Sequence, residues 1–351
     1  MNRRGYLDWL RGLSVLIMIE AHTLDSWTRL ADRQNAVYGW AMIIAGFAAP
    51  GFLFLAGVSM ALAAGSRMRR GSTAGAVTAL AIRRSLQIFA LAFLFRLQSW
   101  VMGGGGPVQG LLKVDILNVM GLSMLAAAIL RSLGRERRER AAWRIAAAVA
   151  IAMLTPIVRA TTLLGPLPDP IEWYIRPIPG RGTFTLFPWA GFLLAGTAVG
   201  LWLDAARTPA DERRVTTALA AVGAALAVAG YAASFLPPIY AQTNFWTTSP
   251  TFFVLRLGIL IASMPLAYAW NALWSGRSVL QEFGRASLFV YWIHVELAYG
   301  VLSAPLRKGL TLNQALIAYA LFSVAMFGAA KMRDRVVEWW NTGRLRPSGA
   351  L

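Results

Sequence analysis

Residues 6–27 read YLDWLRGLSVLIMIEAHTLDSW, an apolar stretch long enough to cross a membrane that also contains ionisable side chains. Among these ionisable residues are Asp8, Arg11, His22 and Asp25. The step from Arg11 to His22 is about three helical turns, so both side chains project from nearly the same face, about 16 Å apart along the axis. Ionisable groups inside a bilayer-spanning helix are costly and usually functional. We therefore expect the chemistry of this chain on this helix.

The composition is that of a polytopic membrane protein. Hydrophobic residues make up 57% of the 351 residues and charged residues only 14%, and the mean hydropathy is +0.53. Soluble domains carry about 25% charged residues. The sequence predicts an all-α transmembrane helical bundle of about ten spans, since about 20 apolar residues cross the hydrocarbon core. The predicted spans are Trp9–Thr28, Tyr38–Ala64, Leu86–Met102, Val114–Leu130, Ile145–Leu164, Phe184–Leu203, Val215–Phe235, Thr251–Trp274, Ser287–Ala304 and Leu312–Ala330.

The basic residues indicate the orientation of these spans. Most of the 34 Lys and Arg residues fall in alternate loops, which the positive-inside rule assigns to the cytoplasm. We expect both termini in the cytoplasm and a single domain over residues 1–351 in the inner (plasma) membrane. The net charge of +18 then reflects topology, and no nucleic-acid partner is expected. The segment RSLGRERRERAAWR, residues 131–144, is predicted to be an inner loop with anionic membrane lipids as neighbours.

Several kinds of site are excluded or disfavoured. The chain has no cysteine, which excludes disulfides, thiolate nucleophiles and cysteine-ligated metals. With only two histidines, we expect no metal site. The glycine run Gly103–Gly106 lacks the Lys and Ser or Thr that follow in a phosphate-binding loop. Glu20, His22 and Asp25 interrupt the first apolar segment, so we expect a retained span and not a cleaved signal peptide.

Further polar residues are predicted at membrane depth. Asp115 and Asn118 are three residues apart at the outer start of a span, so they share a helix face. Arg96 lies near the end of the preceding span, and His294 lies in the middle of the ninth. Together with Asp25, these residues are candidates for binding a substrate or orienting a catalytic group. For His294, a hydrogen bond between helices is the alternative role.

Five sequence blocks resemble one family of membrane enzymes. They are residues 6–27, AAPGFLFLAGVSMAL (48–62), VDILNVMGLSML (114–125), TLFPWAGFLLAGTAVG (185–200) and GRASLFVYWIHVELAYG (284–300). In this order they resemble integral-membrane acyltransferases, the group that contains heparan-alpha-glucosaminide N-acetyltransferase and its bacterial relatives. The Arg11 to His22 spacing is also similar to that of the glycan O-acyltransferases called acyltransferase family 3. Both resemblances imply transfer of an acyl group, usually acetyl, from cytoplasmic acyl-CoA to a sugar hydroxyl or amine at the outer face.

The resemblance gives the polar residues expected roles. His22 is expected either to remove the proton of the acceptor as a general base or to carry the acyl group itself. Arg11 is expected to orient Asp8 or to bind an anionic part of CoA. Further candidates for the CoA phosphates lie on the inner side: Arg67, Arg69, Arg70, Arg83 and Arg84. We expect acetyl-CoA as the acyl donor, a sugar or glycan as the acceptor and no metal.

The chain departs from the family in one feature, and two other classes of membrane protein are alternatives to an acyltransferase. Human-type members of the family carry a functional histidine in the first lumenal loop, whereas His22 lies within the predicted helix, so an amino-sugar acceptor is not assumed. A secondary transporter or flippase also combines many spans with a few buried charges. The absence of a clear repeat and the concentration of ionisable residues on one helix disfavour that class. A membrane scaffold leaves Asp8, Arg11 and His22 unexplained. The sequence leaves the oligomeric state open.

Overall fold

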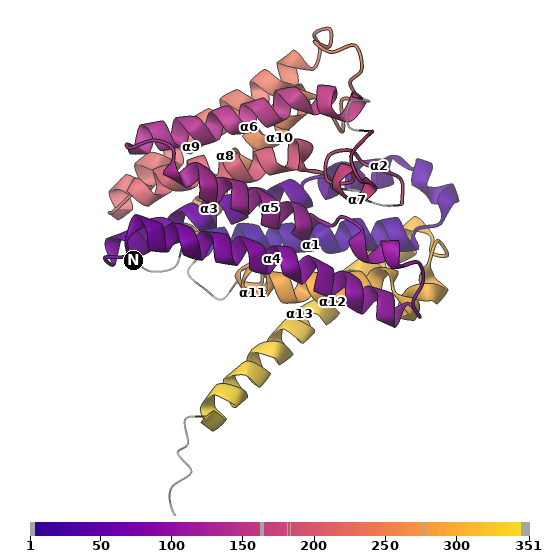
Figure 1. Cartoon of the computed structure of the whole chain (residues 1–351). Helices are drawn as coiled ribbons and strands as arrows, with labels where there is room; N and C mark the ends of the chain where they lie inside the picture. Colours follow the sequence, from indigo (N-terminus) through magenta and orange to yellow (C-terminus); the bar gives the residue numbers. More distant parts are fainter. Residues whose placement is uncertain are drawn as a thin grey trace, which may run out of the picture. The chain divides into compact units, whose positions relative to one another are not determined.

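A computed structural model describes residues 4–161, 165–180, 182, 184–274, 276 and 278–344 (Figure 1). Over these residues the chain forms helices and two isolated β-bridges but no strands, so the all-α prediction is confirmed. In chain order the elements are α1 (Gly5–Trp27), η1 (Leu30–Gln34), α2 (Ala36–Ala45), α3 (Ala48–Arg69), α4 (Ala74–Met102), η2 (Val108–Leu112), α5 (Ile116–Ile129), η3 (Leu130–Ser132), α6 (Arg137–Ala160), α7 (Asp169–Glu172), α8 (Leu186–Ala205), α9 (Pro209–Ala233), α10 (Pro250–Leu273), α11 (Val279–Arg285), α12 (Ser287–Tyr299), η4 (Val301–Leu306) and α13 (Leu312–Arg344).

Every predicted span falls on a helix, but fewer of these helices have the length and composition of a membrane span. Among the described residues there are seven such helices: Ala36–Arg69, Ala74–Met102, Arg137–Ala160, Leu186–Ala205, Pro209–Ala233, Pro250–Leu273 and Leu312–Asn341. The count of about ten spans is therefore not confirmed. Leu164, the predicted end of one span, lies outside the described residues, and the cytoplasmic location of the termini stays a prediction.

The three remaining helices depart from a simple span for different reasons. With 14 and 13 residues, α5 and α12 are shorter than the roughly 20 residues that a complete crossing requires. The 23 residues of α1 are enough, but charged side chains recur along it, among them Asp8, Arg11 and Glu20. The helix that the sequence singled out for chemistry is therefore the long helix least like an ordinary lipid-facing span.

The chain divides into two compact units. The terminal unit combines both ends of the chain, Met1–Ala48 and Ser275–Leu351, and the central unit is Ala49–Trp274. The terminal unit contains α1, α2 and α11 to α13, and the central unit contains nearly all of α3 together with α4 to α10. The expectation of a single domain over residues 1–351 stays a prediction.

In the terminal unit, α1 packs against α11, α12 and α13, and α13 runs obliquely to α1 (Figure 1). The contact with α11 is unusually close. A Cβ atom on Gly12 would lie 1.8 Å from the carbonyl oxygen of Leu280, and one on Gly284 would lie 1.9 Å from that of Asp8. Glycine lets two membrane helices approach backbone to backbone. The N-terminal part of α1 is thereby held at a fixed position along α11.

In the central unit, α9 packs along α10, α4 along α5, and α6 along α8 (Figure 1). A second close approach joins α3 to α8. A Cβ atom on Gly57 would lie 2.1 Å from the carbonyl oxygen of Leu193, and one on Gly196 would lie 2.1 Å from that of Phe54. Packing between these two helices therefore explains Gly196 and Gly200 of the block at 185–200, whereas Gly191 faces Phe253 on α10 and Ala148 on α6.

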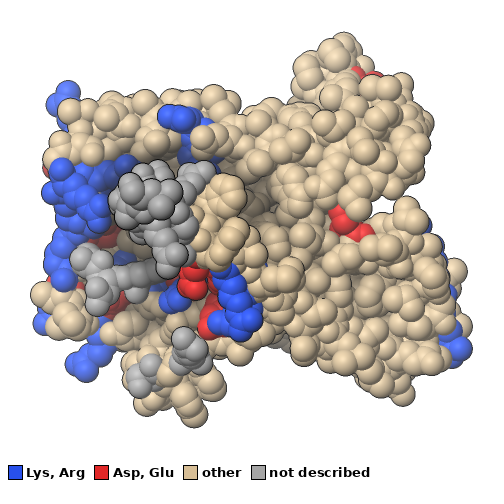
Figure 2. Space-filling model, turned by 90° about the horizontal axis from the view of Figure 1, so that it is seen from below, with Lys and Arg blue, Asp and Glu red and all other residues tan. Residues whose placement is uncertain are grey.

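Large apolar side chains remain on the surface of the described residues. Phe235 is 72% exposed, Leu266 71% and Val324 70%. Figure 2 shows Lys and Arg side chains gathered mainly toward one edge of the face that it draws, with uncharged residues over most of the rest. Soluble proteins rarely expose apolar area on this scale, whereas a lipid bilayer covers it. Together with the seven long apolar helices, this surface makes the chain a multi-pass membrane protein.

Adding a methyl group at the α3–α8 contact is expected to destabilise the protein. Gly196→Ala should lower the free energy of unfolding by about 1–3 kcal/mol, the usual cost of overpacking a tight contact. The matched control is Gly75→Ala, because a Cβ atom at Gly75 meets nothing within 4 Å. Thermal unfolding of the detergent-solubilised protein measures both variants. Equal melting temperatures for the two would contradict the α3–α8 packing.

Candidate functional site

Both histidines of the chain meet in the terminal unit. The Nδ1 atom of His22, on α1, lies 2.9 Å from the Nε2 atom of His294, on α12. The two ring planes are 4° apart and the ring centroids 5.0 Å apart. His294 is fully buried, whereas His22 is partly exposed. Residues from opposite ends of the sequence thus form one site, in which His22 is the accessible member.

The hydrogen-bond partners determine which ring nitrogens carry protons. The Nδ1 atom of His294 lies 2.8 Å from the carbonyl oxygen of Val290, which can only accept, so His294 carries a proton on Nδ1. The Nε2 atom of a neutral His294 is therefore an acceptor, and Nδ1 of His22 donates to it. This arrangement leaves a lone pair on Nε2 of His22. Such a nitrogen can accept a proton or attack a carbonyl carbon.

An aromatic and charged group lies beside His22. The Tyr299 ring meets the His22 ring edge-on, with centroids 5.4 Å apart at 66°. The Tyr299 hydroxyl donates to Oδ2 of Asp25 at 2.9 Å, and Nη1 of Arg33 lies 3.5 Å from Oδ1 of Asp25. The structure therefore places Asp25 near His22 only by way of Tyr299. The contact that orients the imidazole comes from His294 and not from Asp25, because the exposed Asp25 carboxylate is engaged by Tyr299 and Arg33.

The register of α1 against α12 is fixed one turn beyond the two histidines. The carbonyl oxygen of Ala298 accepts hydrogen bonds from Ser26 Oγ at 2.7 Å and from Trp27 Nε1 at 3.0 Å. The hydroxyl of Ser303 also donates to it, at 2.9 Å. Ser26 follows His22 by four residues and Ala298 follows His294 by four, so these bonds lie directly above the pair along both helices. A shift of either helix would break both sets of contacts.

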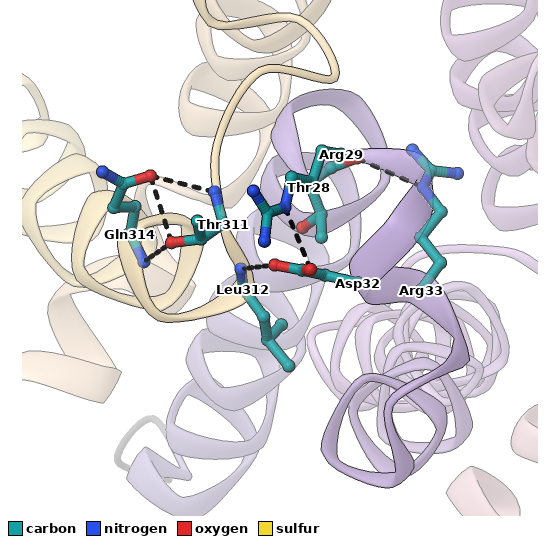
Figure 3. A network of polar contacts seen from close by, with 7 residues as sticks. All are labelled: Thr28, Arg29, Asp32, Arg33, Thr311, Leu312 and Gln314. Carbon is teal, nitrogen blue, oxygen red and sulfur yellow. Dashed lines mark hydrogen bonds and ion pairs between the residues drawn. The ribbon is translucent and has the colours of Figure 1, made fainter.

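The segment after α1 is tied to the start of α13 by the polar network that Figure 3 shows. One oxygen of the Asp32 carboxylate accepts from the backbone N–H of Leu312 at 2.8 Å, and the other accepts from Arg29 Nε at 2.9 Å. The Nε atom of Arg33 donates to the carbonyl oxygen of Thr28 at 3.2 Å. The Leu312 N–H, and then Arg29, lower the pKa of Asp32 below its ordinary value of 3.8. Asp32 thus acts as an N-terminal cap of α13 contributed by a distant segment.

At the other end of α1, Asp8 and Arg11 are paired as expected. The Asp8 side chain is buried, and its Oδ1 atom lies 2.7 Å from Nη1 of Arg11. The Nε atom of Arg285, at the end of α11, lies 4.0 Å from the other carboxylate oxygen. The structure pairs Arg11 with Asp8, and a catalytic role for either residue stays a prediction. Contact of Arg11 with CoA stays a prediction.

The predicted substrate-binding residues of the central unit form a group of their own. Arg96 Nη2 lies 2.8 Å from Oδ2 of Asp115, and the Asp115 N–H donates to Asn118 Oδ1 at 2.9 Å. Asp115 and Asn118 form a capping box at the start of α5. Asn118 also bonds to Tyr174, and burial raises the pKa of Tyr174 to about 12. Asp115 lies just outside the helix, so it meets Asn118 through the cap and not on a shared helix face, and the pattern Asp-x-x-Asn could have indicated the cap. Substrate binding by this group stays a prediction.

The arginines expected to bind the CoA phosphates lie on the surface of the central unit. Arg69 is paired with Asp204 at 2.7 Å. The other four are exposed at the end of α3 and on α4, without an ion pair to any described carboxylate: Arg67, Arg70, Arg83 and Arg84. These four are open to an anionic ligand, and their role in binding CoA stays a prediction.

Comparison with protein families now adds to this geometry. The family model described as heparan-alpha-glucosaminide N-acetyltransferase, catalytic, matches residues 3–232 of the 351. The chain belongs to this family. The comparison with curated proteins gives no match. Membership makes the chain a membrane transferase of the acetyltransferase type.

The match to the heparan-alpha-glucosaminide N-acetyltransferase family covers only part of the site. It includes Asp8, Arg11 and His22 on α1 but ends before α12. His294 and the block at 284–300 therefore lie outside it, and the resemblance of that block stays a prediction. The geometry nevertheless brings His294 to His22. Among the described residues there is no group of three or more His, Asp or Glu that could hold a metal ion.

One buried carboxylate on α12 was not among the predicted site residues. Glu296, two residues after His294, is 9% exposed. Its Oε1 atom is buried without a hydrogen-bond partner among the described residues. A buried polar atom without a partner is uncommon and often functional. Its position as an ionisable residue within a predicted span was the sequence signal that pointed to it.

The Asp32 cap of α13 predicts a pH-dependent contribution to stability. A carboxylate whose pKa is lowered by folding stabilises the fold above its ordinary value of 3.8, and this stabilisation is lost as the pH falls through the lowered value. Asp32→Asn should therefore lower the melting temperature at pH 7, and the difference from the wild type should shrink below about pH 4. Thermal unfolding of the solubilised protein between neutral and acidic pH tests this. A difference that does not change with pH would speak against the charged cap.

Proposed function

We propose that the protein transfers an acetyl group from cytoplasmic acetyl-CoA to an amine or hydroxyl of a sugar or glycan at the outer face of the inner (plasma) membrane. The observation that carries this proposal is the pairing of His22 with His294, which leaves a lone pair on Nε2 of His22. An imidazole in this state is the usual base for acyl transfer near neutral pH. The family match supports acetyl as the group that is moved.

In the proposed step, Nε2 of His22 takes the proton from the acceptor N–H or O–H. The acceptor nitrogen or oxygen bonds to the thioester carbonyl carbon, the carbon–sulfur bond breaks, and the CoA thiolate leaves with the proton held by His22. While His22 is positively charged, its Nδ1–H remains bonded to His294. Hydrogen bonds from a charged donor are stronger than those from a neutral one. His294 therefore acts as a positioning residue that also stabilises the charged form of His22.

A covalent route uses the same lone pair. Nε2 of His22 would attack the thioester carbonyl, release the CoA thiolate and pass the acetyl group to the acceptor in a second step. We favour the general-base route because it needs no other group to activate the imidazole. Mass spectrometry of the protein after incubation with acetyl-CoA alone separates the two routes, since only the covalent one leaves an acetyl group on His22.

The remaining site residues have supporting roles in this proposal. Tyr299 and Asp25 lie beside the accessible face of His22 and are proposed to contact the acceptor, with the carboxylate accepting from a hydroxyl or amine. Arg11, held by Asp8, is proposed to meet the donor near the inner surface. The exposed arginines of α3 and α4 are proposed to bind CoA phosphates, and the capped group at the start of α5 to bind substrate: Arg67, Arg70, Arg83, Arg84, Arg96, Asp115 and Asn118.

Removing the imidazole of His22 tests the proposal directly. His22→Ala is expected to lower acetyl transfer by about 10²–10⁴-fold, the usual contribution of a general base. Binding of acetyl-CoA, measured by calorimetry on the solubilised protein, should remain. Transfer is measured with radiolabelled acetyl-CoA and with both an amino sugar and a neutral glycan as acceptor. Unchanged transfer in His22→Ala would reject the proposed role of His22. No binding of acetyl-CoA by the wild type would reject the proposed function and favour a transporter.

Variants of His294 test the positioning role. His294→Ala removes the acceptor for the Nδ1–H of His22 and is expected to lower kcat about 10- to 100-fold, as for other residues that orient a functional histidine. The KM for acetyl-CoA should change little. His294→Gln keeps an acceptor oxygen and should restore part of kcat. A purely structural role would instead lower the melting temperature of both variants without a difference in kcat between them.

A further inference from the structure

Three arginines lie close together in the central unit, where α5 gives way to α6. Arg131 is on η3, and Arg140 and Arg144 are four residues apart on α6, so the latter two share a helix face. The Nε atom of Arg140 donates to the carbonyl oxygen of Gly134 at 3.1 Å, which closes the loop after η3 onto α6. We call Arg131, Arg140 and Arg144 the arginine cluster.

The cluster is partly buried and poorly compensated. Arg144 is only 4% exposed, and its Nη1 atom donates to the carbonyl oxygen of Arg140. The charges of Arg131 and Arg140 both act on Arg144. The Nε atom of Arg131 is buried without a hydrogen-bond partner among the described residues. Arg131 and Arg140 are themselves half-buried, so the cluster can be reached from one side.

No carboxylate of the described residues forms an ion pair with the cluster. The nearest acidic residues in the sequence, Glu136 and Glu139, are used in the capping box of α6. Burying a guanidinium without a counter-charge is costly, and two further positive charges raise that cost. The positive-inside rule accounts for arginines in this loop but not for the burial of Arg144. A bound anion would supply the missing negative charge.

We propose that the arginine cluster is a binding site for a phosphate group. Guanidinium binds phosphate oxygens through two parallel hydrogen bonds, which ammonium groups cannot match. Three positive charges suit a phosphate monoester, which carries close to two negative charges at neutral pH, better than a phosphodiester, which carries one. A monoester oxygen would also give the buried Nε of Arg131 an acceptor.

Two sources supply such a monoester on the predicted inner side of the membrane. One is a lipid that ends in a phosphate, such as phosphatidic acid, and the other is the 3′-phosphate of the acyl-CoA donor. Only the second source rests on the proposed function. Phosphate binding itself does not, so the site can exist whether or not the protein transfers acetyl groups.

The test uses the full-length protein in neutral detergent. Melting temperatures are measured with inorganic phosphate, acetyl-CoA, 3′-dephospho-acetyl-CoA, and mixed micelles of phosphatidic acid or phosphatidylcholine. A ligand that binds only the folded state raises the melting temperature. Arg144→Gln is expected to lose the upward shift given by the monoester, and Arg135→Gln, exposed in the same loop, should keep it. Without ligand, Arg144→Gln should be at least as stable as the wild type, because it removes an uncompensated buried charge.

The pattern of shifts identifies the source. The lipid is supported if Arg144→Gln loses only the shift that phosphatidic acid gives. The donor is supported if Arg144→Gln loses a shift that acetyl-CoA gives and 3′-dephospho-acetyl-CoA does not give. Equal shifts in the wild type, Arg144→Gln and Arg135→Gln for every probe, or no shift in the wild type, would overturn the proposal. Should Arg144→Gln not fold, Arg131→Gln takes its place. Acetyl transfer is assayed on the same preparations so that the two proposals can be told apart. If phosphate raises the melting temperature of a wild type that shows no transfer, only the proposed function is rejected.

Discussion

The hydrogen bond between His22 and His294 joins the two ends of the chain, and the terminal unit is built so that it can form. The Val290 carbonyl can only accept, so it fixes the proton of His294, and His294 then fixes the proton of His22. The bond between the two histidines requires one register of α1 against α12. The Ala298 carbonyl secures that register one turn further out, where Ser26 and other donors of α1 and η4 converge on it. Hydrogen bonds to backbone carbonyl oxygens thus orient Nε2 of His22 as much as the side-chain contact does.

Burial also separates α1, the helix of the candidate catalytic residues, from helices that expose large apolar side chains. On α1, Val15, Ile19 and Leu24 have no exposed surface and Asp8 is buried, so much of this helix faces protein side chains. In contrast, α9 and α13 leave large apolar side chains such as Val228 and Val324 exposed. Charges within a membrane protein are tolerated where they face protein and have partners. The charged residues of α1 and its packing against other helices both follow from the requirement that such charges face protein.

The sequence predicted the helix α1, and ionisable side chains inside an apolar segment were the local signal for its candidate residues. The Asp8–Arg11 pair follows from a spacing of three residues on one helix. The His22–His294 contact was not predictable in this way, since 272 residues separate the partners and nothing local specifies how α12 packs. The count of about ten spans is not confirmed, since seven helices of the described residues have the length and composition of a span. The number of apolar residues in a segment does not show where a helix begins or ends. Here α5 begins at the cap formed by Asp115, and α12 ends at Gly300.

The same limit applies to the basic residues. The positive-inside rule accounts for a net charge of +18 that is concentrated in alternate loops. Exposed arginines such as Arg83 and Arg135 satisfy this rule as well as buried ones do. Membrane topology depends on the sign of a charge and on the side of the membrane where it lies, and it gives no reason to bury the charge. The burial of Arg144 beside two further guanidiniums therefore calls for a separate cause. Desolvating a charge is compensated only by a partner of opposite sign held at short range, and no described carboxylate is placed to be that partner.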